Sequence, residues 1–163
     1  MLRPLTIRQA SAQDVDSIAH IINRAFAVER FFVEGDRTSR EAVAKLMTRG
    51  VFLVGEDIHS QPIACVYTET RLEGRGYIGL LSVEPLHQHV GHGARLMHAA
   101  EQHLKDVGCH AVDISVVNLR TELPPFYRKL GYAERKTAPF PDNSRATQPC
   151  YFIIMSKSLT PSV

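Results

Sequence analysis

The sequence lacks the features that mark membrane-spanning, secreted and nucleic-acid-binding proteins. Among its 163 residues no apolar stretch approaches the roughly 18 needed to span a bilayer, and residues 1–11 lack the apolar centre of a signal peptide. The formal net charge is only +2, and runs of like charge are short. These absences predict a cytoplasmic protein whose primary partner is neither a nucleic acid nor a membrane.

Cysteine is scarce, and Cys65, Cys109 and Cys150 lie in or beside apolar, strand-like runs. Because their number is odd, buried free thiols are favoured over disulfides. No motif frames any of them, so a catalytic cysteine is not expected. Repeats and linkers are also missing, and a hydrophobic content of 44% suffices for one core. A single domain over residues 1–163 is predicted, as a monomer or a homodimer.

Apolar spacing predicts secondary structure in the order β-α-α-β-β-β-α-β-α-β-β. The expected strands are residues 5–8, 51–55, 62–71, 77–83, 111–117, 132–135 and 150–156. The expected helices run from Asp14, as the cap, to Phe26, from a Thr38 or Ser39 cap with Glu41 in a capping box to about Arg49, after Gly93 to Gly108, and from Leu123 to Leu130. Short connections favour an antiparallel meander in the middle of the chain, followed by a parallel strand-helix-strand unit.

The helix after Gly93 is expected to be amphipathic. Its predicted buried stripe is Leu96, Ala100, Leu104 and Val107, and its predicted solvent-facing residues are Arg95, Glu101, Gln102, Lys105 and Asp106.

Two glycines stand between the strand that ends at Val83 and this helix. Gly91 and Gly93 leave the backbone without a Cβ, so successive N–H groups can point at one anion beside the positive end of the helix dipole. A P-loop would need a Lys-Ser or Lys-Thr pair after Gly93, and a Rossmann fingerprint would need a glycine where Leu96 stands. A phosphate-binding loop of another kind is predicted.

The pattern Gln88-x-x-Gly91-x-Gly93 resembles the acyl-coenzyme A signature of the GNAT N-acetyltransferase superfamily. A second segment, from Phe126 through Tyr127 to Gly131 and Tyr132, resembles the Phe-Tyr-x-x-x-Gly-Phe segment of that family. The resemblance implies an α/β (α+β) fold: one GNAT-type domain with a mixed, mostly antiparallel sheet of about six or seven strands and helices on both faces.

The resemblance also implies acetyl-coenzyme A (acetyl-CoA) as cofactor, held between the strands that end at Val83 and Asn118. Backbone groups of Leu81, Ser82 and Val83 would bind the pantetheine amides and polarise the thioester carbonyl. Asn118 would bond the pantetheine arm. The pyrophosphate would lie on the loop and helix start, formed by Gln88, His89, Val90, Gly91, His92, Gly93 and Ala94.

Tyr127 is the predicted catalytic residue, because a phenol with a pKa near ~10 is protonated at neutral pH and can protonate the departing thiolate. Many members of the family carry a glutamate as general base at a place that falls on or near Tyr77 in this chain. No carboxylate lies between Tyr77 and Val83. Glu69 on the preceding strand could substitute, or water could carry the proton away.

His87, His89 and His92 lie within six residues of one another. A tight turn at Gly91 would point them in different directions, and no cysteine or carboxylate completes a ligand set, so no metal site is predicted. Partial positive charge near phosphate is the favoured role of these histidines.

The acceptor is expected to contact residues 28–37 and 137–149 and, on the sheet, Glu69 and Tyr77. Phe31 or Phe32 could pack against its carbon skeleton, and the acidic side chains Glu29, Glu34 and Asp36 could attract a cationic amine. A small-molecule amine, a peptide N-terminus and a lysine side chain all stay open. The predicted function is N-acetyl transfer to a primary amine by direct attack in a ternary complex. The alternatives are a non-catalytic, acyl-CoA-binding GNAT-fold module and an unrelated nucleotide-binding module.

Overall fold

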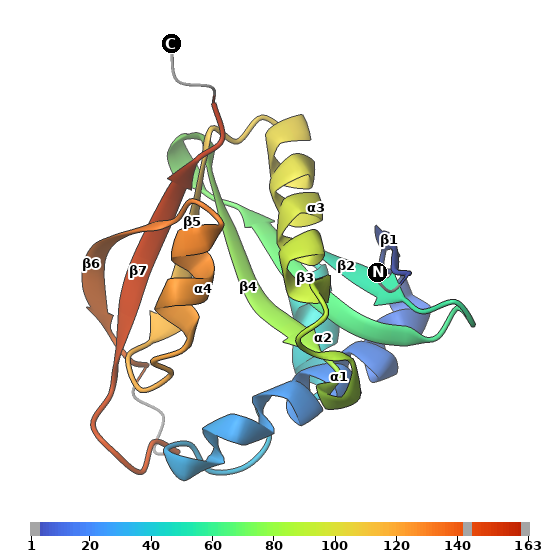
Figure 1. Ribbon diagram of the computed structural model, residues 1–163, viewed down its shortest axis with the longest axis horizontal. Coiled ribbons are helices and arrows are strands. Elements are labelled where there is room, and N and C mark those ends of the chain that lie inside the picture. Colours follow the sequence, from blue (N-terminus) through green and yellow to red (C-terminus); the bar gives the residue numbers. More distant parts are fainter. Residues whose placement is uncertain (1–3, 142–144, 161–163) are drawn as a thin grey trace.

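The computed structural model describes residues 4–141 and 145–160, and a seven-stranded sheet lies at its centre (Figure 1). The strands follow the order β1-β2-β3-β4-β5-β7-β6, in which β4 and β5 are parallel and every other neighbouring pair is antiparallel. The strand bounds are β1 Thr6–Gln9, β2 Val51–Glu56, β3 Pro62–Thr70, β4 Arg75–Val83, β5 Ala111–Val117, β6 Ala133–Pro139 and β7 Tyr151–Ser158. The predicted fold class and order of elements are confirmed.

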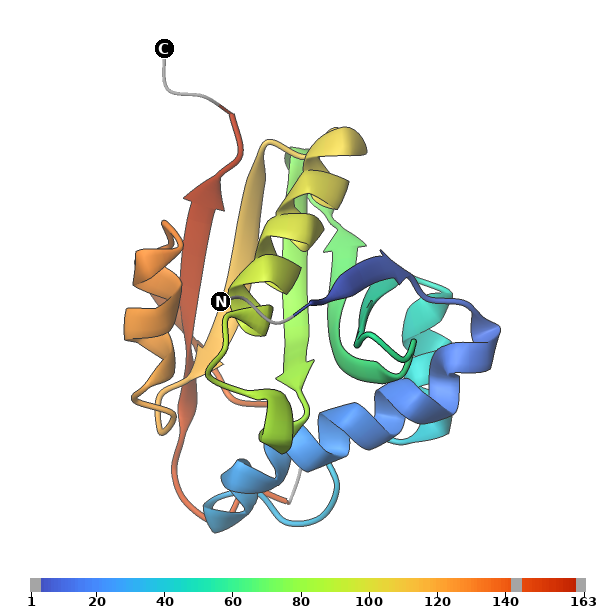
Figure 2. The same cartoon turned by 45° about the vertical axis from the view of Figure 1, so that its right-hand side comes forward.

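Four α-helices cover the two faces of the sheet (Figures 1 and 2). They are α1 Val15–Ala25, α2 Arg40–Met47, α3 His92–Asp106 and α4 Leu123–Lys129, joined by the short 3-10 turns η1 Ala12–Asp14, η2 Phe26–Phe31, η3 Leu72–Gly74 and η4 Pro85–His87. Helices α1 and α2 pack on one face, and α3 and α4 pack on the other. No helix in the described ranges is both long and apolar enough to span a membrane.

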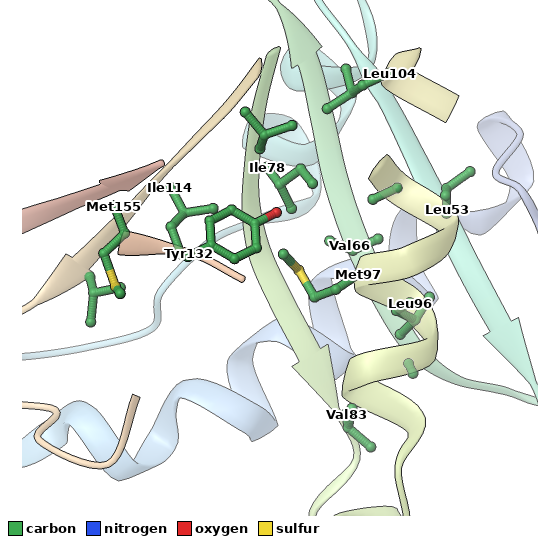
Figure 3. Close-up of a cluster of buried hydrophobic side chains, with 14 of the residues drawn as sticks. Leu53, Val66, Ile78, Val83, Leu96, Met97, Leu104, Ile114, Tyr132 and Met155 are labelled. Atoms are coloured by element: carbon green, nitrogen blue, oxygen red, sulfur yellow. The ribbon is translucent and has the colours of Figure 1, made fainter. Parts of the chain in front are cut away.

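Two clusters of buried side chains form the core, one on each face of the sheet. Figure 3 shows the larger cluster, in which Met97 of α3 and Tyr132 lie between the helix and the strands that carry Ile78 and Ile114. The cluster under α1 and α2 includes Cys65, which is fully buried. All three cysteines are free: Cys65 and Cys109 are buried as predicted, and Cys150 is half-buried.

The two parallel strands stay together over only a short length. Their paired residues are Arg75–Ala111, Gly76–Val112 and Tyr77–Asp113, and no residue pair joins the fully described strands β4 and β5 beyond this point. On their outer sides β4 continues to pair with β3 as far as Val83, and β5 with β7 as far as Val117. The strands therefore diverge toward their carboxyl ends, as Figure 1 shows.

Asp113 holds the strands together where they begin to separate. Arg75 of β4 donates from Nε to Asp113 Oδ2 (2.8 Å) and from Nη2 to Oδ1 (2.6 Å). The Ser156 hydroxyl of β7 also donates to Asp113 Oδ1, and Arg135 of β6 lies 3.6 Å away. The Arg75 guanidinium holds the pKa of Asp113 down at about 2. Four strands meet at this one carboxylate.

Strand β4 carries a bulge midway along its diverging part. Between the pairs Tyr67–Gly79 and Cys65–Ser82, β4 contains one residue more than β3. Leu80 takes up the extra residue with a left-handed φ of 55°, a conformation that costs a non-glycine residue roughly 1–3 kcal/mol. The bulge sends Leu80 to the α1 face and Leu81 to the α3 face.

The prediction for α3 was wrong at two positions. Glu101 is buried, with 8% exposure, because its carboxylate accepts hydrogen bonds from the Tyr132 hydroxyl and from Lys157 Nζ, each at 2.8 Å. Val107 is 53% exposed because α3 ends at Asp106, one residue earlier. The partners of Glu101 lie too far along the chain for helical spacing to reveal them.

The helix caps also differ from the prediction. Ser39 caps α2, and its Oγ accepts from the amide of Ala42, so Glu41 is not at the position a capping box requires. Asp14 precedes α1 but does not cap it with its side chain; it accepts from the Ser11 amide and pairs with Arg8 at 2.8 Å instead. The last two strands are longer than predicted, because residues 136–139 and 157–158 continue the ladder.

Asp113→Asn should lower the free energy of unfolding by on the order of 2 kcal/mol at pH 7. The folded-state pKa of about 2 lies below the unfolded value of about 3.9, so the carboxylate stabilises the protein above that pH. This stabilisation is lost as the pH falls through 4 toward 2, and the two proteins should converge there. Urea unfolding at several pH values measures the difference.

Asp16→Asn is the matched control, because Asp16 is 75% exposed in its ion pair with Arg40 and should change the stability by less than about 0.5 kcal/mol. A stability difference between Asp113→Asn and the parent that stayed constant from pH 7 to pH 2 would contradict this role of Asp113.

Candidate active site

A cavity of about 800 Å³ occupies the space where β4 and β5 have separated. Its lining includes Tyr77 and Leu80, which pack with the core under α1 and α2, and Leu81 and Tyr127, which pack with the core under α3 and α4. The cavity therefore reaches both faces of the sheet. Along it run the inner edges of β4 and β5, whose backbone groups have no partner strand.

The glycine loop closes one end of the cavity. Gly91 precedes α3 with a left-handed φ of 92°, and Gln88 Nε2 donates to the carbonyl of Val83 at 2.9 Å, which ties the loop to the end of β4. The first N–H groups of a helix have no intrahelical acceptor, so the amides of Gly93 and Ala94 are available to an anion. A Cβ at Gly93 would lie 3.5 Å from the Phe126 ring, on the cavity wall.

Most of the predicted cofactor-binding residues line this cavity. They are Leu81, Val83, Gln88, His89, Gly91, His92, Gly93, Ala94 and Tyr127. Ser82 and Val90 lie outside the lining, and the Ser82 hydroxyl donates to the carbonyl of Leu80. Asn118 also lies outside it: its Oδ1 accepts from the Tyr151 amide at 2.8 Å and closes the end of the β5–β7 ladder.

Tyr127 lies in the middle of α4, and its side chain lines the cavity. Its ring packs edge-on against Phe126 and Tyr132, with ring centres 5.0 Å and 5.9 Å away. Burial, with a smaller contribution from nearby Tyr77, raises the pKa of the Tyr127 phenol to about 12. The hydroxyl is therefore a proton donor over the whole neutral range.

Tyr77 reaches the same cavity from the opposite face. An added Cβ at Gly79 would come within 2.7 Å of the Tyr77 ring, so the missing side chain makes room for this phenol. The Arg71 guanidinium lies over the Tyr77 ring, 4.0 Å from its centre.

Glu69, the predicted substitute base, does not line the cavity. Its carboxylate accepts from the Tyr67 hydroxyl at 2.8 Å and from Arg71 Nε at 3.0 Å, and Arg49 lies 3.4 Å away. Burial acts to raise the pKa of Glu69, but these partners together lower it. The carboxylate is a structural ion-pair centre behind Tyr77.

The three histidines near the glycine loop are not gathered into one site. His92 is buried at the start of α3, His89 is exposed with a left-handed φ of 66°, and His87 is half-buried in η4. Within residues 4–141 and 145–160 no three histidine, cysteine or acidic side chains are grouped as metal ligands.

The two predicted acceptor segments join over the other end of the cavity. Val33 forms a β-bridge with Ala146, the Glu34 amide donates to the carbonyl of Arg145, and the Thr147 amide donates to that of Phe32, each at 2.8 Å. Of the residues predicted to contact the acceptor, Glu29 and Tyr77 line the cavity; Phe31 is 54% exposed, Phe32 is fully buried, and Glu34 and Asp36 are exposed outside it. That these loops contact the acceptor stays a prediction, and the side chains of Phe31, Phe32, Glu34 and Asp36 are not on the cavity wall.

The cavity wall at this end carries an ion pair that the sequence did not reveal. Arg120 Nη1 donates to Glu29 Oε2 at 2.8 Å, and the two side chains are only 16% and 12% exposed. Burial raises the pKa of Glu29, although Arg120 and Arg37 oppose the rise. Arg120 follows the carboxyl end of β5, the position where ligands gather in such sheets, and this was the available signal.

Diverging parallel strands, unpaired inner edges and a helix N-terminus together are suited to a long ligand that carries amides and an anionic end. The sequence model of the Acetyltransferase (GNAT) family matches residues 15–132. The chain belongs to this family. The GNAT fold binds acetyl-CoA.

Solved structures of this fold match nearly the whole chain. The ribosomal-protein-S18-alanine N-acetyltransferase from Escherichia coli has a TM-score of 0.78 at 19% identity, covering 98% of this chain and 97% of that one. Ard1 from Thermoplasma volcanium has a TM-score of 0.79 at 17% identity, covering 96% and 99%. The structure of yncA from Salmonella typhimurium with its cofactor acetyl-CoA has a TM-score of 0.76 at 17% identity, covering 98% and 96%. No curated protein matches the chain in sequence.

Gly93→Glu should abolish the rise in melting temperature that acetyl-CoA produces, because it places a negative side chain on the cavity wall beside the amides of α3. Gly93 is the better test position, since a substitution at Gly91 would also strain the left-handed backbone. Differential scanning fluorimetry with and without acetyl-CoA measures the effect.

His98→Glu, on the exposed side of α3, is the matched control and should keep the full rise. If folded Gly93→Glu protein bound acetyl-CoA as tightly as the parent, the anion site would not lie at this helix end.

Proposed function

We propose that the protein is an acetyl-CoA-dependent N-acetyltransferase, which transfers an acetyl group to a primary amine by direct attack in a ternary complex. The observation that supports this most directly is the set of unpaired inner strand edges along the cavity, with Tyr127 on its wall. These edges offer backbone donors and acceptors in the spacing of a strand, which suits a chain of amides such as the pantetheine arm.

Three parts of the chain would hold the cofactor. Backbone groups of Leu81, Ser82 and Val83 would bond the pantetheine arm, and an amide at the bulge would polarise the thioester carbonyl. The N-terminal amides of α3 would bind the pyrophosphate. That Asn118 bonds the pantetheine arm stays a prediction. Its Oδ1 already accepts a hydrogen bond from the Tyr151 amide. When bound, acetyl-CoA supplies the acetyl group as an activated thioester.

Tyr127 acts as the general acid. Its phenol, with the pKa raised to about 12, keeps its proton until the departing sulfur needs it. The packing of its ring against Phe126 and Tyr132 fixes its position. Proton donation during C–S bond cleavage avoids the release of a free thiolate into a largely apolar cavity.

The amine must lose a proton as well, and β4 provides no carboxylate for this between Tyr77 and Val83. Glu69 is held in its own ion-pair cluster away from the cavity, so the proton passes either to water or to another carboxylate on the acceptor side. The missing carboxylate on β4 is the one observation that favours the second candidate function, a GNAT-fold module that binds acyl-CoA without turnover.

Tyr127→Phe should lower kcat by about 10²- to 10⁴-fold and leave the affinity for acetyl-CoA unchanged, since the substitution removes only the hydroxyl. Release of free coenzyme A thiol is measured against a panel of amino acids, polyamines, aminoglycosides and peptides. Tyr151→Phe is the control, because Tyr151 is 45% exposed and lies outside the cavity lining.

A Tyr127→Phe enzyme as fast as the parent, with chemistry limiting the rate, would remove Tyr127 from the mechanism. Binding of acetyl-CoA without transfer to any member of the panel would favour the non-catalytic module.

A further inference from the structure

The acceptor end of the cavity carries charges of both signs, at positions that none of the family motifs covers. Glu29 and Arg120 form their ion pair on the wall itself, from the η2 turn and from the segment after β5. Burying two charges carries a desolvation cost that their mutual attraction has to offset. A pair retained on a cavity wall therefore points to a ligand that interacts with it.

Glu29 has room for a second partner. Arg120 binds only its Oε2, and no hydrogen bond to its Oε1 occurs among the described residues. The desolvated carboxylate, whose pKa is raised by burial, is suited to receive an ammonium group and then a proton. Arg120 keeps the carboxylate in place and is in turn oriented by Glu122 at 3.3 Å.

Two further guanidinium groups line the same end of the cavity. Arg37 lies over the Phe26 ring, 5.4 Å from its centre, and its positive charge acts to lower the pKa of Glu29. Arg145 donates to the backbone carbonyls of Glu34 and Asp36. Neither Arg37 nor Arg145 forms an ion pair with a carboxylate in the described ranges, so their positive charges are available to an anionic group.

Several other side chains of this wall are apolar. They are those of Phe26, Val28, Val33, Phe140 and Phe152. A ligand that fits all three features has an ammonium group, an anionic group close to it, and an apolar remainder.

On the basis of the proposed function, we infer that the acceptor is a free α-amino acid with an apolar side chain. Glu29 binds its ammonium group, Arg37 and Arg145 bind its carboxylate, and the aromatic and aliphatic wall takes its side chain. A peptide N-terminus or a lysine side chain presents an amine without an adjacent carboxylate and would leave these arginines uncompensated.

The proton balance fits this placement. Glu29 accepts one proton of the ammonium, and this transfer frees the nitrogen lone pair to form the N–C bond. Glu29 later releases the proton to solvent. Tyr127 protonates the sulfur as the C–S bond breaks. The second proton lost from nitrogen restores the Tyr127 phenol through water, and the third stays in the amide.

The acceptor class is tested with acetyl-CoA, the twenty L-amino acids, their α-amides and tripeptides that carry them at the N-terminus. Free apolar amino acids should give the highest kcat/KM, at least about 10-fold above their α-amides. Arg37→Gln should raise KM about 10- to 100-fold for the amino acid and leave the α-amide nearly unchanged. Higher kcat/KM for α-amides or tripeptides, or an equal effect of Arg37→Gln on both, would overturn the inference while the proposed function stood.

If no acceptor is acetylated, the proposed function fails, and the acceptor site is tested separately by calorimetric titration of the same amino acids into the protein saturated with coenzyme A. Binding that Arg37→Gln weakens would support the inference. No binding by any of the twenty would overturn it.

Glu29→Gln should keep the hydrogen bond to Arg120 but lower kcat/KM for the amino acid by about 10²- to 10⁴-fold, with the thermal shift by acetyl-CoA unchanged. Glu34→Gln makes the same charge change on the same segment outside the cavity and should keep parental activity. Equal kcat/KM in Glu29→Gln and Glu34→Gln would show that Glu29 does not receive the amine.

Discussion

Backbone amides and carbonyls inside a protein need hydrogen-bond partners, and this requirement governs the region between β4 and β5. The strands share only three residue pairs, so beyond Tyr77 and Asp113 each presents an unpaired edge to the other. Elsewhere in this sheet, a neighbouring strand provides partners for such an inner edge. Here a cavity fills the gap, from the glycine loop at one end to two joined loops at the other, and a ligand with the hydrogen-bonding pattern of a peptide would complete the sheet.

The two ends of the cavity are suited to recognise ligands by different means. At the end near the glycine loop the proposed contacts come from the backbone, at the bulge of β4 and at the first turn of α3, and they would depend on where the chain runs more than on which side chains it carries. At the other end the proposed contacts come from side chains on irregular segments, with Glu29 and Arg37 from the connection after α1 and Arg145 from the connection before β7. A backbone site can serve one common cofactor, while loop side chains can differ with each acceptor.

This difference explains what the sequence could predict. The order of strands, the parallel unit and the anion-binding turn follow from local patterns: β-branched runs, helical spacing, and glycines where the backbone must approach a ligand. Tyr127 was predicted as the catalytic residue because its segment keeps a recognisable spacing, and its place on the cavity wall is compatible with that role. Three features were not predicted, since each depends on partners distant along the chain: the bulge at Leu80, the ion pairs of Asp113 and the burial of Glu101. The Glu29–Arg120 pair joins residues 91 positions apart, and local periodicity has no bearing on such a contact.

The ion pairs of the Asp113 carboxylate lie at the point where β4 and β5 begin to diverge, so a small change of angle there is magnified at the strand ends. The diverging part of β4, from Tyr77 to Val83, spans six residue steps, or roughly 20 Å. A rotation of this part by about 3° about the Asp113 ion pairs would move the strand end by about 1 Å. A hydrogen bond to the inner edge is lost over a displacement of that size. The ion pairs around Asp113 lie outside the cavity, so a substitution there would act on ligand binding through the angle between the strands and not through lost contacts.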